Sequence, residues 1–163
     1  MKKLTHLLID GYNVIHACQP FQSVLKKNLD AACKLLIEHI VPLHSNEKLR
    51  TTIVFDGKGL DIQIEHPTND PSFSVLFTPS GTTADTLIEQ LVFNSQHKNP
   101  FIVVSADNAL IQTVSSMGAH ALTPSDFKDW LERSNKAQSS KILDHQKKSA
   151  EQWKQANPWK NLK

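Results

Sequence analysis

The sequence contains only two cysteines, Cys18 and Cys33, among its 163 residues. Two thiols in a chain of this size supply neither a disulfide framework nor the spacing of a zinc site. This scarcity of cysteine is typical of a protein that works in a reducing compartment.

Long apolar runs are also missing from the sequence. No stretch approaches the roughly 18 consecutive apolar residues that a membrane-spanning helix needs. Met1-Lys2-Lys3 is similar to the basic start of a signal peptide, but Asp10 interrupts the next apolar run too early for a secretory core. We therefore expect a cytoplasmic protein with no membrane partner.

Charge is nearly balanced over the whole chain but is unevenly distributed. The formal net charge is +2, with 18 basic and 16 acidic residues. Residues 1–127 carry 9 basic and 12 acidic side chains, whereas residues 128–163 carry 9 and 4. An acidic body with a basic tail suits a metal centre joined to a segment that meets phosphates. A solvated terminal helix explains the basic tail equally well.

The length and the order of predicted elements favour one α/β domain with a sizeable core. Apolar runs that predict strands alternate with helical periodicity, which implies right-handed crossovers and a mostly parallel sheet. No internal repeat of fixed period is visible. The predicted strands are Leu4–Ile9, Thr51–Phe55, Phe73–Phe77, Phe101–Val104 and His120–Leu122, and the predicted helices are Gln22–His44, Thr83–Gln96, Asn108–Met117 and Ser125–Arg133. Asp61–His66 is a candidate for a short extended piece.

Four acidic residues follow or adjoin the ends of predicted strands: Asp10, Asp56, Asp85 and Asp107. Several carboxylates at one edge of a sheet repel one another, and a divalent cation removes that cost. Hard oxygen ligands without a cysteine or a histidine pair suit Mg²⁺ or Mn²⁺. Such a metal activates water and stabilises charge at a phosphoryl group, which is the chemistry of phosphodiester hydrolysis.

Each acid also has a purely structural interpretation. Asp10 and Asp107 could cap the helical turns that follow them. Thr82-Thr83-Ala84-Asp85 fits a capping box, and Asp56 before Gly57 fits simple turn chemistry. Asp126 differs from the four, because its place in Thr123-Pro124-Ser125-Asp126 is explained by a helix start alone.

Polar residues beside the acids are candidates for supporting roles. Asn13 and Ser105 could orient a water or a phosphate oxygen, or tie the backbone of their own turns. Glu89 lies one helical turn beyond Asp85, where it could be an outer ligand or face solvent. His16 is better explained as a packed or surface imidazole than as a general base.

Four motifs together resemble the YacP-like branch of the NYN domain, a member of the PIN-like nuclease group. They are Asp10-Gly11-Tyr12-Asn13, Val54-Phe55-Asp56-Gly57, Thr83-Ala84-Asp85-Thr86-Leu87-Ile88-Glu89 and Val104-Ser105-Ala106-Asp107. The resemblance implies a PIN-like three-layer sandwich around a five-stranded sheet of order 3-2-1-4-5. It also implies that Asp10, Asp85 and Asp107 bind Mg or Mn, with Asn13 and Asp56 in support.

The function implied by this resemblance is metal-dependent endonucleolytic cleavage of RNA, with ribosome-associated mRNA among the candidate substrates. The alternative is a non-catalytic RNA- or ribosome-binding module on the same fold. A small phosphatase is a weaker alternative, because Asp10-Gly11-Tyr12 lacks the Asp-x-Asp pairing of the haloacid dehalogenase type. One departure from the family is a short loop after Asp56, which puts the RNA-positioning loop of relatives in doubt.

We expect the nuclease domain to span residues 1–133 and a basic, helical tail to span residues 134–163. Lysines interleaved with aromatic residues suit a phosphate backbone and stacked bases. The nucleic-acid-binding candidates are Lys58 near the sheet edge and Lys147, Lys148 and Trp159 in the tail. Trp153 falls on the apolar side of the tail, where packing onto the domain is an equal alternative.

Overall fold

The computed structural model describes residues 4–95, 99–136 and 147–148. Its strands are β1 (His6–Asp10), β2 (Arg50–Phe55), β3 (Gln63–Glu65), β4 (Phe73–Phe77), β5 (Phe101–Val104) and β6 (His120–Leu122). Its helices are α1 (Gly11–Ala17), α2 (Phe21–Leu25), α3 (Leu29–Glu47), α4 (Ala84–Ser95) and α5 (Asn108–Ser116), followed by a helix over residues 124–136. The predicted α/β class is confirmed.

One sheet of six strands, in the order β3-β4-β2-β1-β5-β6, forms the middle of the molecule. Five of these strands are parallel and follow the predicted order 3-2-1-4-5. The sixth strand, β3, was expected only as a short extended piece. It pairs antiparallel with β4 as an exposed edge strand, so its three residues bury no core face that could reveal it in the sequence.

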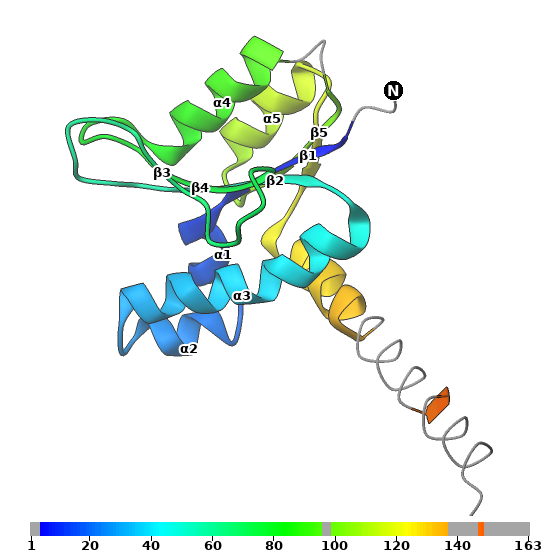
Figure 1. Cartoon of the computed structure of the whole chain (residues 1–163). Helices are drawn as coiled ribbons and strands as arrows, with labels where there is room; N and C mark the ends of the chain where they lie inside the picture. Colours follow the sequence, from blue (N-terminus) through cyan, green and yellow to red (C-terminus); the bar gives the residue numbers. More distant parts are fainter. Residues whose placement is uncertain (1–3, 96–98, 137–146, 149–163) are drawn as a thin grey trace, which may run out of the picture.

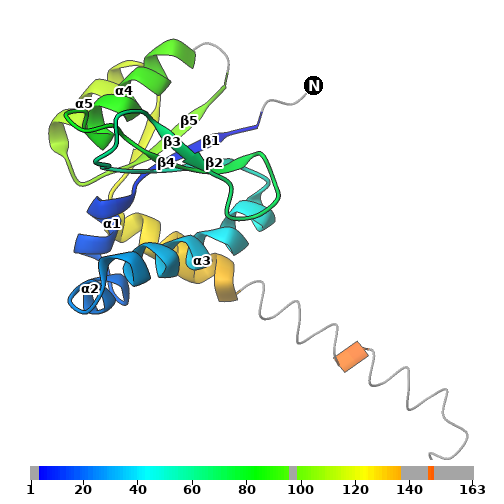
Figure 2. The ribbon, with the colours of Figure 1, turned by 60° about the vertical axis from the view of Figure 1, so that its left-hand side comes forward.

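Helices cover both faces of the sheet, so the molecule has three layers. Figures 1 and 2 show α4 and α5 on one side of the sheet and α1, α2 and α3 on the other. The central strand β1 supplies both cores because its side chains alternate between the two faces. Leu7 and Ile9 belong to the core under α3, whereas Leu8 belongs to the core under α4 and α5.

The long helix predicted over Gln22–His44 is two helices in the structure. The helical pattern is interrupted after α2, and α3 begins at Leu29. Its N-cap is Asn28, whose side chain accepts a hydrogen bond from the Ala31 N–H at 3.1 Å. Asparagine is a strong N-cap residue, and it starts a new helix even though the apolar periodicity continues across the break. The core positions of α3 are Ala32, Leu36, Ile40 and Leu43.

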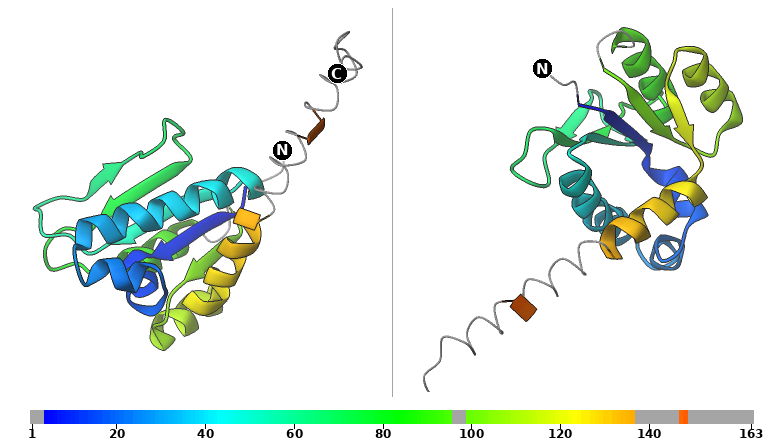
Figure 3. Two further views of the ribbon diagram at one scale, coloured as in Figure 1. Left: turned by 90° about the horizontal axis from the view of Figure 1, so that it is seen from below. Right: turned by 90° about the vertical axis from the view of Figure 1, so that its right-hand side faces the viewer.

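The helix over residues 124–136 extends beyond its predicted end at Arg133 and lies against α3 (Figure 3). Ser134, which the sequence placed at the start of the basic tail, is buried in this helix. Asn46 of α3 donates a hydrogen bond to the Ser134 Oγ at 3.1 Å. Most of the predicted tail helix, including Trp153 and Trp159, lies outside the described residues. None of the helices in the described parts of the chain has the length and apolarity required to cross a membrane.

Candidate functional site

The predicted acids meet at the carboxyl edge of the parallel strands. Asp10 is the last residue of β1 and pairs in register with Val54 of β2, while Ile9 pairs with Val104 of β5. Asp56 comes directly after β2, and Asp107 lies three residues beyond the end of β5. Because parallel strands all end at the same edge, three acids from distant parts of the sequence are brought to one place.

Asp10 is the most deeply buried of these acids, with 4% of its surface exposed. Its two carboxylate oxygens accept hydrogen bonds from Asn13, one from the side-chain amide at 2.8 Å and one from the backbone N–H at 3.4 Å. Burial raises the pKa of Asp10, and the nearby charge of Asp56 raises it further. Asp10 therefore both caps α1 and carries a carboxyl group for which the described part of the chain shows no ion pair.

Asn13 joins two elements of the site through the two ends of its side-chain amide. The nitrogen donates to Asp10, and the oxygen accepts a hydrogen bond from the Ala106 N–H at 3.0 Å. Both groups are therefore engaged by the protein. The contact reaches the neighbouring turn after β5 and not only its own turn, so Asn13 links α1 to the loop that carries Asp107.

Asp107 begins α5, as the capping alternative predicted. Its carboxylate accepts the Leu110 N–H at 3.1 Å, and its own N–H donates to the buried hydroxyl of Ser105 at 3.1 Å. The backbone bond from Leu110 and the contact with Asp85 lower the pKa of Asp107. Ser105 thus ties its own turn, and Asp107 is the most readily ionised of the three clustered acids.

Asp85 is the residue that connects the cluster. It lies in the first turn of α4, half-buried, within hydrogen-bonding reach of the carboxyl groups of Asp10 and Asp107. Burial, followed by these two neighbouring carboxyls, raises the pKa of Asp85 to about 7. A helix N-terminus favours a negative charge, yet here desolvation and like charge outweigh that preference.

The capping box predicted for Asp85 is wrong in its detail. Thr83, not Thr82, caps α4: its hydroxyl accepts the Thr86 N–H at 3.2 Å and contacts the Thr86 hydroxyl at 2.9 Å. Thr86 therefore takes the position in the box that the sequence pattern gave to Asp85. The carboxyl of Asp85 is not needed for the cap and turns to the other acids.

Asp56 lies at the margin of this cluster. One of its carboxylate oxygens accepts the Ala84 N–H, at 2.7 Å, which is the first backbone donor of α4. The sequence pattern pointed only to a turn at Asp56-Gly57. The turn is present as well, because the Gly57 N–H donates to the Thr78 hydroxyl at 3.1 Å.

The cluster supplies the hard oxygen donors that Mg²⁺ and Mn²⁺ prefer. Within residues 4–95 and 99–136, however, no group of three or more His, Cys, Asp or Glu side chains is already spaced as a ligand set. Burial and the neighbouring carboxyls of Asp10 and Asp107 instead raise the pKa of Asp85, so that a proton on Asp85 would neutralise one of the three clustered charges. The donor chemistry fits a divalent cation, which would replace that proton.

The other predicted site residues lie apart from these contacts. Glu89 is half-buried on α4, and Lys58 is exposed in the loop after β2. Lys147 and Lys148 are exposed and helical, whereas the prediction for Trp159 lies outside the described residues. Sequence reasoning missed the partners that fix the site, above all Phe55 and Thr83. The spacing of Thr83 and Thr86, three residues apart at the start of an apolar helix, is the sequence signal that could have identified Thr83 as the cap.

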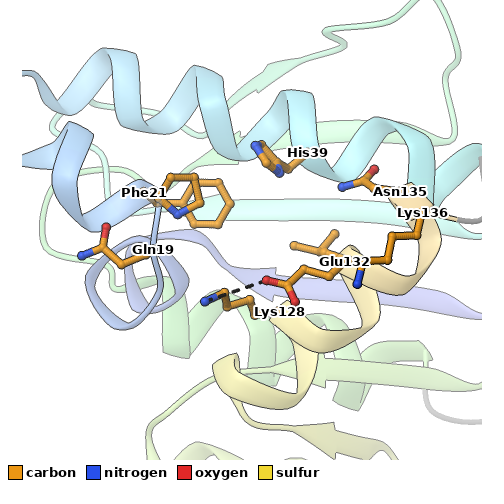
Figure 4. A pocket seen from close by; sticks show the side chains of 9 residues that line it. Gln19, Phe21, His39, Lys128, Glu132, Asn135 and Lys136 are labelled. Carbon is orange, nitrogen blue, oxygen red and sulfur yellow. Dashed lines mark ion pairs between the residues drawn. The ribbon is translucent and has the colours of Figure 1, made fainter. Parts of the chain in front are cut away.

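A groove elsewhere on the surface contains none of the predicted site residues. It has a volume of about 240 Å³ and lies between α3 and the helix over residues 124–136 (Figure 4). Phe21, Leu131 and Pro20 supply apolar lining. On its rim, the Nζ atom of Lys128 lies 3.9 Å from the Oε1 atom of Glu132. The groove is a feature separate from the acidic cluster.

Comparison with protein families agrees with the motifs. The model of the YacP-like NYN domain matches residues 7–162. Among curated proteins, the uncharacterised protein YacP of Bacillus subtilis (strain 168) is 33% identical over 88 residues, which are 52% of this chain and 49% of that protein. The match therefore spans about half the length of this relative.

Comparison with solved structures gives the same fold. The crystal structure of Rae1 (YacP) from Bacillus subtilis is similar with a TM-score of 0.75 and 22% identity, over 94% of this chain and 86% of that chain. A tryptophan-to-leucine variant of the same protein gives a TM-score of 0.74 at 22% identity, over 88% and 85% of the two chains. At this identity the likeness shows the fold alone.

Proposed function

The chain belongs to the YacP-like NYN domain family, and on that premise we propose that it is a metal-dependent endoribonuclease. The PIN-like nuclease fold of this family is present throughout the described sheet. The proposed reaction is hydrolysis of phosphodiester bonds in RNA with Mg²⁺ or Mn²⁺ as cofactor.

One observation carries this proposal: the carboxyls of Asp10 and Asp107 lie near enough to Asp85 to raise the pKa of its carboxyl. Three carboxyl groups from three separate segments converge at the sheet edge, where ligands of open α/β folds bind. Such a convergence destabilises the protein unless a proton or a cation neutralises it. A metal site accounts for this arrangement better than helix capping does, because capping needs no contact among the acids.

The residues of the cluster have distinct proposed roles. Asp10, Asp85 and Asp107 would hold the cation, and a bound cation supplies water activation and charge neutralisation at the phosphoryl group. Asn13 keeps Asp10 and the Ala106 turn at a fixed separation through its two hydrogen bonds. The exposed ammonium group of Lys58 is the candidate contact for an RNA phosphate.

The direct test is incubation of the purified protein with end-labelled single-stranded RNA in Mn²⁺, in Mg²⁺ and in EDTA. Internal cleavage that needs a divalent cation and disappears in EDTA is the expected result. Uncut RNA in all three conditions, from a protein that is folded by circular dichroism, would contradict the proposal.

The alternative function is a non-catalytic RNA-binding module. The carboxylates of Asp10 and Asp107 already accept hydrogen bonds from Asn13 and Leu110. These structural roles favour a binding module, because they explain both acids without a metal. A module of this kind would bind the same RNA in EDTA and in Mn²⁺ and would leave it intact. A cytoplasmic location and a ribosome partner remain predictions of the sequence for either function.

A further inference from the structure

We propose that Asp56 is a positioning residue that sets the place of Asp85, and that it is not a ligand of the metal. The inference rests on the proposed function, because it assigns a role within the same acidic cluster. It separates Asp56 from Asp10, Asp85 and Asp107, although all four acids adjoin the same sheet edge.

The contact between Asp56 and Ala84 carries this assignment. Asp56 directly follows β2, and its carboxylate accepts the Ala84 N–H at 2.7 Å. Ala84 is the first residue of α4 and precedes Asp85 directly. The hydrogen bond therefore fixes the start of the helix against the end of the strand, one residue from the carboxyl that connects the cluster.

The first turn of α4 is held from two independent sides. Thr83 satisfies the Thr86 N–H from within the helix, and Asp56 satisfies the Ala84 N–H from the neighbouring strand. The N–H groups of a first helical turn have no partners inside the helix. The local cap orders the turn itself, whereas the Asp56 bond ties that turn to the end of β2, beside the apolar packing of α4 on the sheet.

Asp56 itself is held in place by the loop around it. The Gly57 N–H donates to the Thr78 hydroxyl, and the Ser80 N–H donates to the Gly59 carbonyl at 2.8 Å. A side chain at Gly57 would meet the Thr78 carbonyl oxygen at 2.2 Å, so this close approach requires glycine. A rigid loop of this kind is what a positioning contact needs.

Two substitutions distinguish a positioning residue from a ligand. Asp56→Asn keeps a side-chain oxygen that accepts the Ala84 N–H but removes the negative charge. Asp56→Ala removes both. Asp85→Asn serves as the variant that loses a proposed ligand, and Asp61→Ala serves as the control, because Asp61 is an exposed acid of the same loop.

The first measurement is hydrogen exchange of the Ala84 amide by NMR. We expect wild-type protection in Asp56→Asn and in Asp61→Ala, and exchange that is faster by about fivefold or more in Asp56→Ala, as for the loss of a helix cap. Unchanged protection of Ala84 in Asp56→Ala would overturn the inference, because the contact would then not hold the helix.

The second measurement is Mn²⁺ affinity by calorimetry together with kcat and KM for RNA cleavage. We expect Asp56→Asn to stay within about threefold of wild type, and Asp56→Ala to lose about tenfold or more in kcat with little change in KM for RNA, as for a misplaced catalytic group. Losses in Asp56→Asn as large as those in Asp85→Asn would show that Asp56 is a ligand.

The two measurements separate this inference from the proposed function. A wild-type protein that binds Mn²⁺ but cleaves no RNA would remove the proposed function, and Mn²⁺ affinity and Ala84 exchange would still decide the role of Asp56. If no variant binds Mn²⁺, the positioning role toward a metal is overturned together with the metal itself.

Discussion

At the scale of single residues, the raised pKa of Asp85 is the most informative property of the molecule. Its pKa is raised to about 7 by burial and by two neighbouring carboxyls, whereas an exposed aspartate titrates near 4. The folded protein thus holds a proton at Asp85 over a pH range in which the unfolded chain has already released it. Binding of that proton makes the fold more stable at acidic than at neutral pH.

The first prediction concerns this pH dependence in metal-free protein. Asp85→Asn removes the ionisable group, so its Tm should exceed that of wild type by an amount that grows as pH rises from about 4 to 7, reaching roughly 3 °C. His6, whose pKa burial lowers to about 4, has the opposite pH dependence but is common to both proteins. Parallel Tm curves for the two proteins across this range would contradict the prediction.

The second prediction concerns the charge of Asp10. Asp10→Asn retains an oxygen for Asn13 but cannot bind a cation as strongly, so cleavage should fall by more than the 10–100-fold that a supporting residue costs. RNA binding should survive, because a repulsive charge near the phosphates is removed. Cleavage rates and melting temperatures of Asp10→Asn and Asp10→Ala check both statements. Cleavage unchanged in both variants would remove Asp10 from the active site.

At the scale of elements, the turn from β1 into α1 depends on a close contact with β2. A Cβ at Gly11 would lie 2.2 Å from the ring of Phe55, which is fully buried and also packs against Tyr12, with ring centroids 5.0 Å apart. Buried side chains have little room to move, so the absence of a side chain at Gly11 sets the distance between these elements.

The third prediction follows from this contact. Gly11→Ala should lower the free energy of unfolding by about 1–3 kcal/mol through overpacking. The double variant Gly11→Ala with Phe55→Leu should recover part of the loss, because the two positions are in direct contact. Gly59→Ala is the control, since its nearest neighbouring atom would lie 3.4 Å from a new Cβ. Urea unfolding is measured on five proteins: wild type, Gly11→Ala, Phe55→Leu, the double variant and the control. Strict additivity of the two single changes would disprove the coupling.

The sequence predicts elements where one residue pattern dominates and misses them where a tertiary partner decides. Strands β4, β5 and β6 match their predicted bounds. β4 and β5 are apolar runs with buried residues, and β6 is a short, half-buried strand that pairs with β5 over its whole length. The exposed strand β3 exists only because β4 supplies its partner. The capping box predicted over Thr82–Asp85 failed for a local reason instead, because the adjacent Thr82 and Thr83 both fit the cap position and Thr83 takes it.

The acids of the site were predictable as a set, but their separate roles were not. A strand that ends in aspartate indicates a place at the sheet edge, so Asp10, Asp56 and Asp107 could be identified from position alone. Which acid contacts another and which binds a backbone N–H depends on the approach of α4 to β2. That approach depends on the packing of α4 against Val54 and on the bond between Ala84 and Asp56, and the packing carries no acidic signal of its own.

At the scale of the whole molecule, acidic and basic regions are separated along the chain. Residues 1–127 have more acidic than basic side chains, and residues 128–163 have the reverse. An acidic cluster that binds metal also repels RNA, so basic residues elsewhere must supply the attraction for the phosphate backbone.

The fourth prediction tests whether the tail supplies that attraction. Lys147→Gln with Lys148→Gln removes two exposed positive charges. RNA affinity should fall, and the slope of log affinity against log salt should flatten by about 0.7 for each lost phosphate contact on a single strand. Lys26→Gln with Lys27→Gln is the control, with the same charge change on another exposed segment. Equal effects of the two pairs would mean that the tail has no special role.

The position of β1 in the middle of the sheet has a consequence for synthesis of the chain. β1 is made first, yet its partners β2 and β5 begin at Arg50 and Phe101. The ribosome must therefore add about 50 residues, in several seconds at ordinary elongation rates, before β2 can pair with one edge of β1. β5 can pair with the other edge only after about twice as long. Because Asp85 and Asp107 also come late, a nascent chain cannot assemble the acidic cluster until most of the protein has left the ribosome. Under the proposed function, the nascent chain is therefore inactive toward the messenger from which it is being translated.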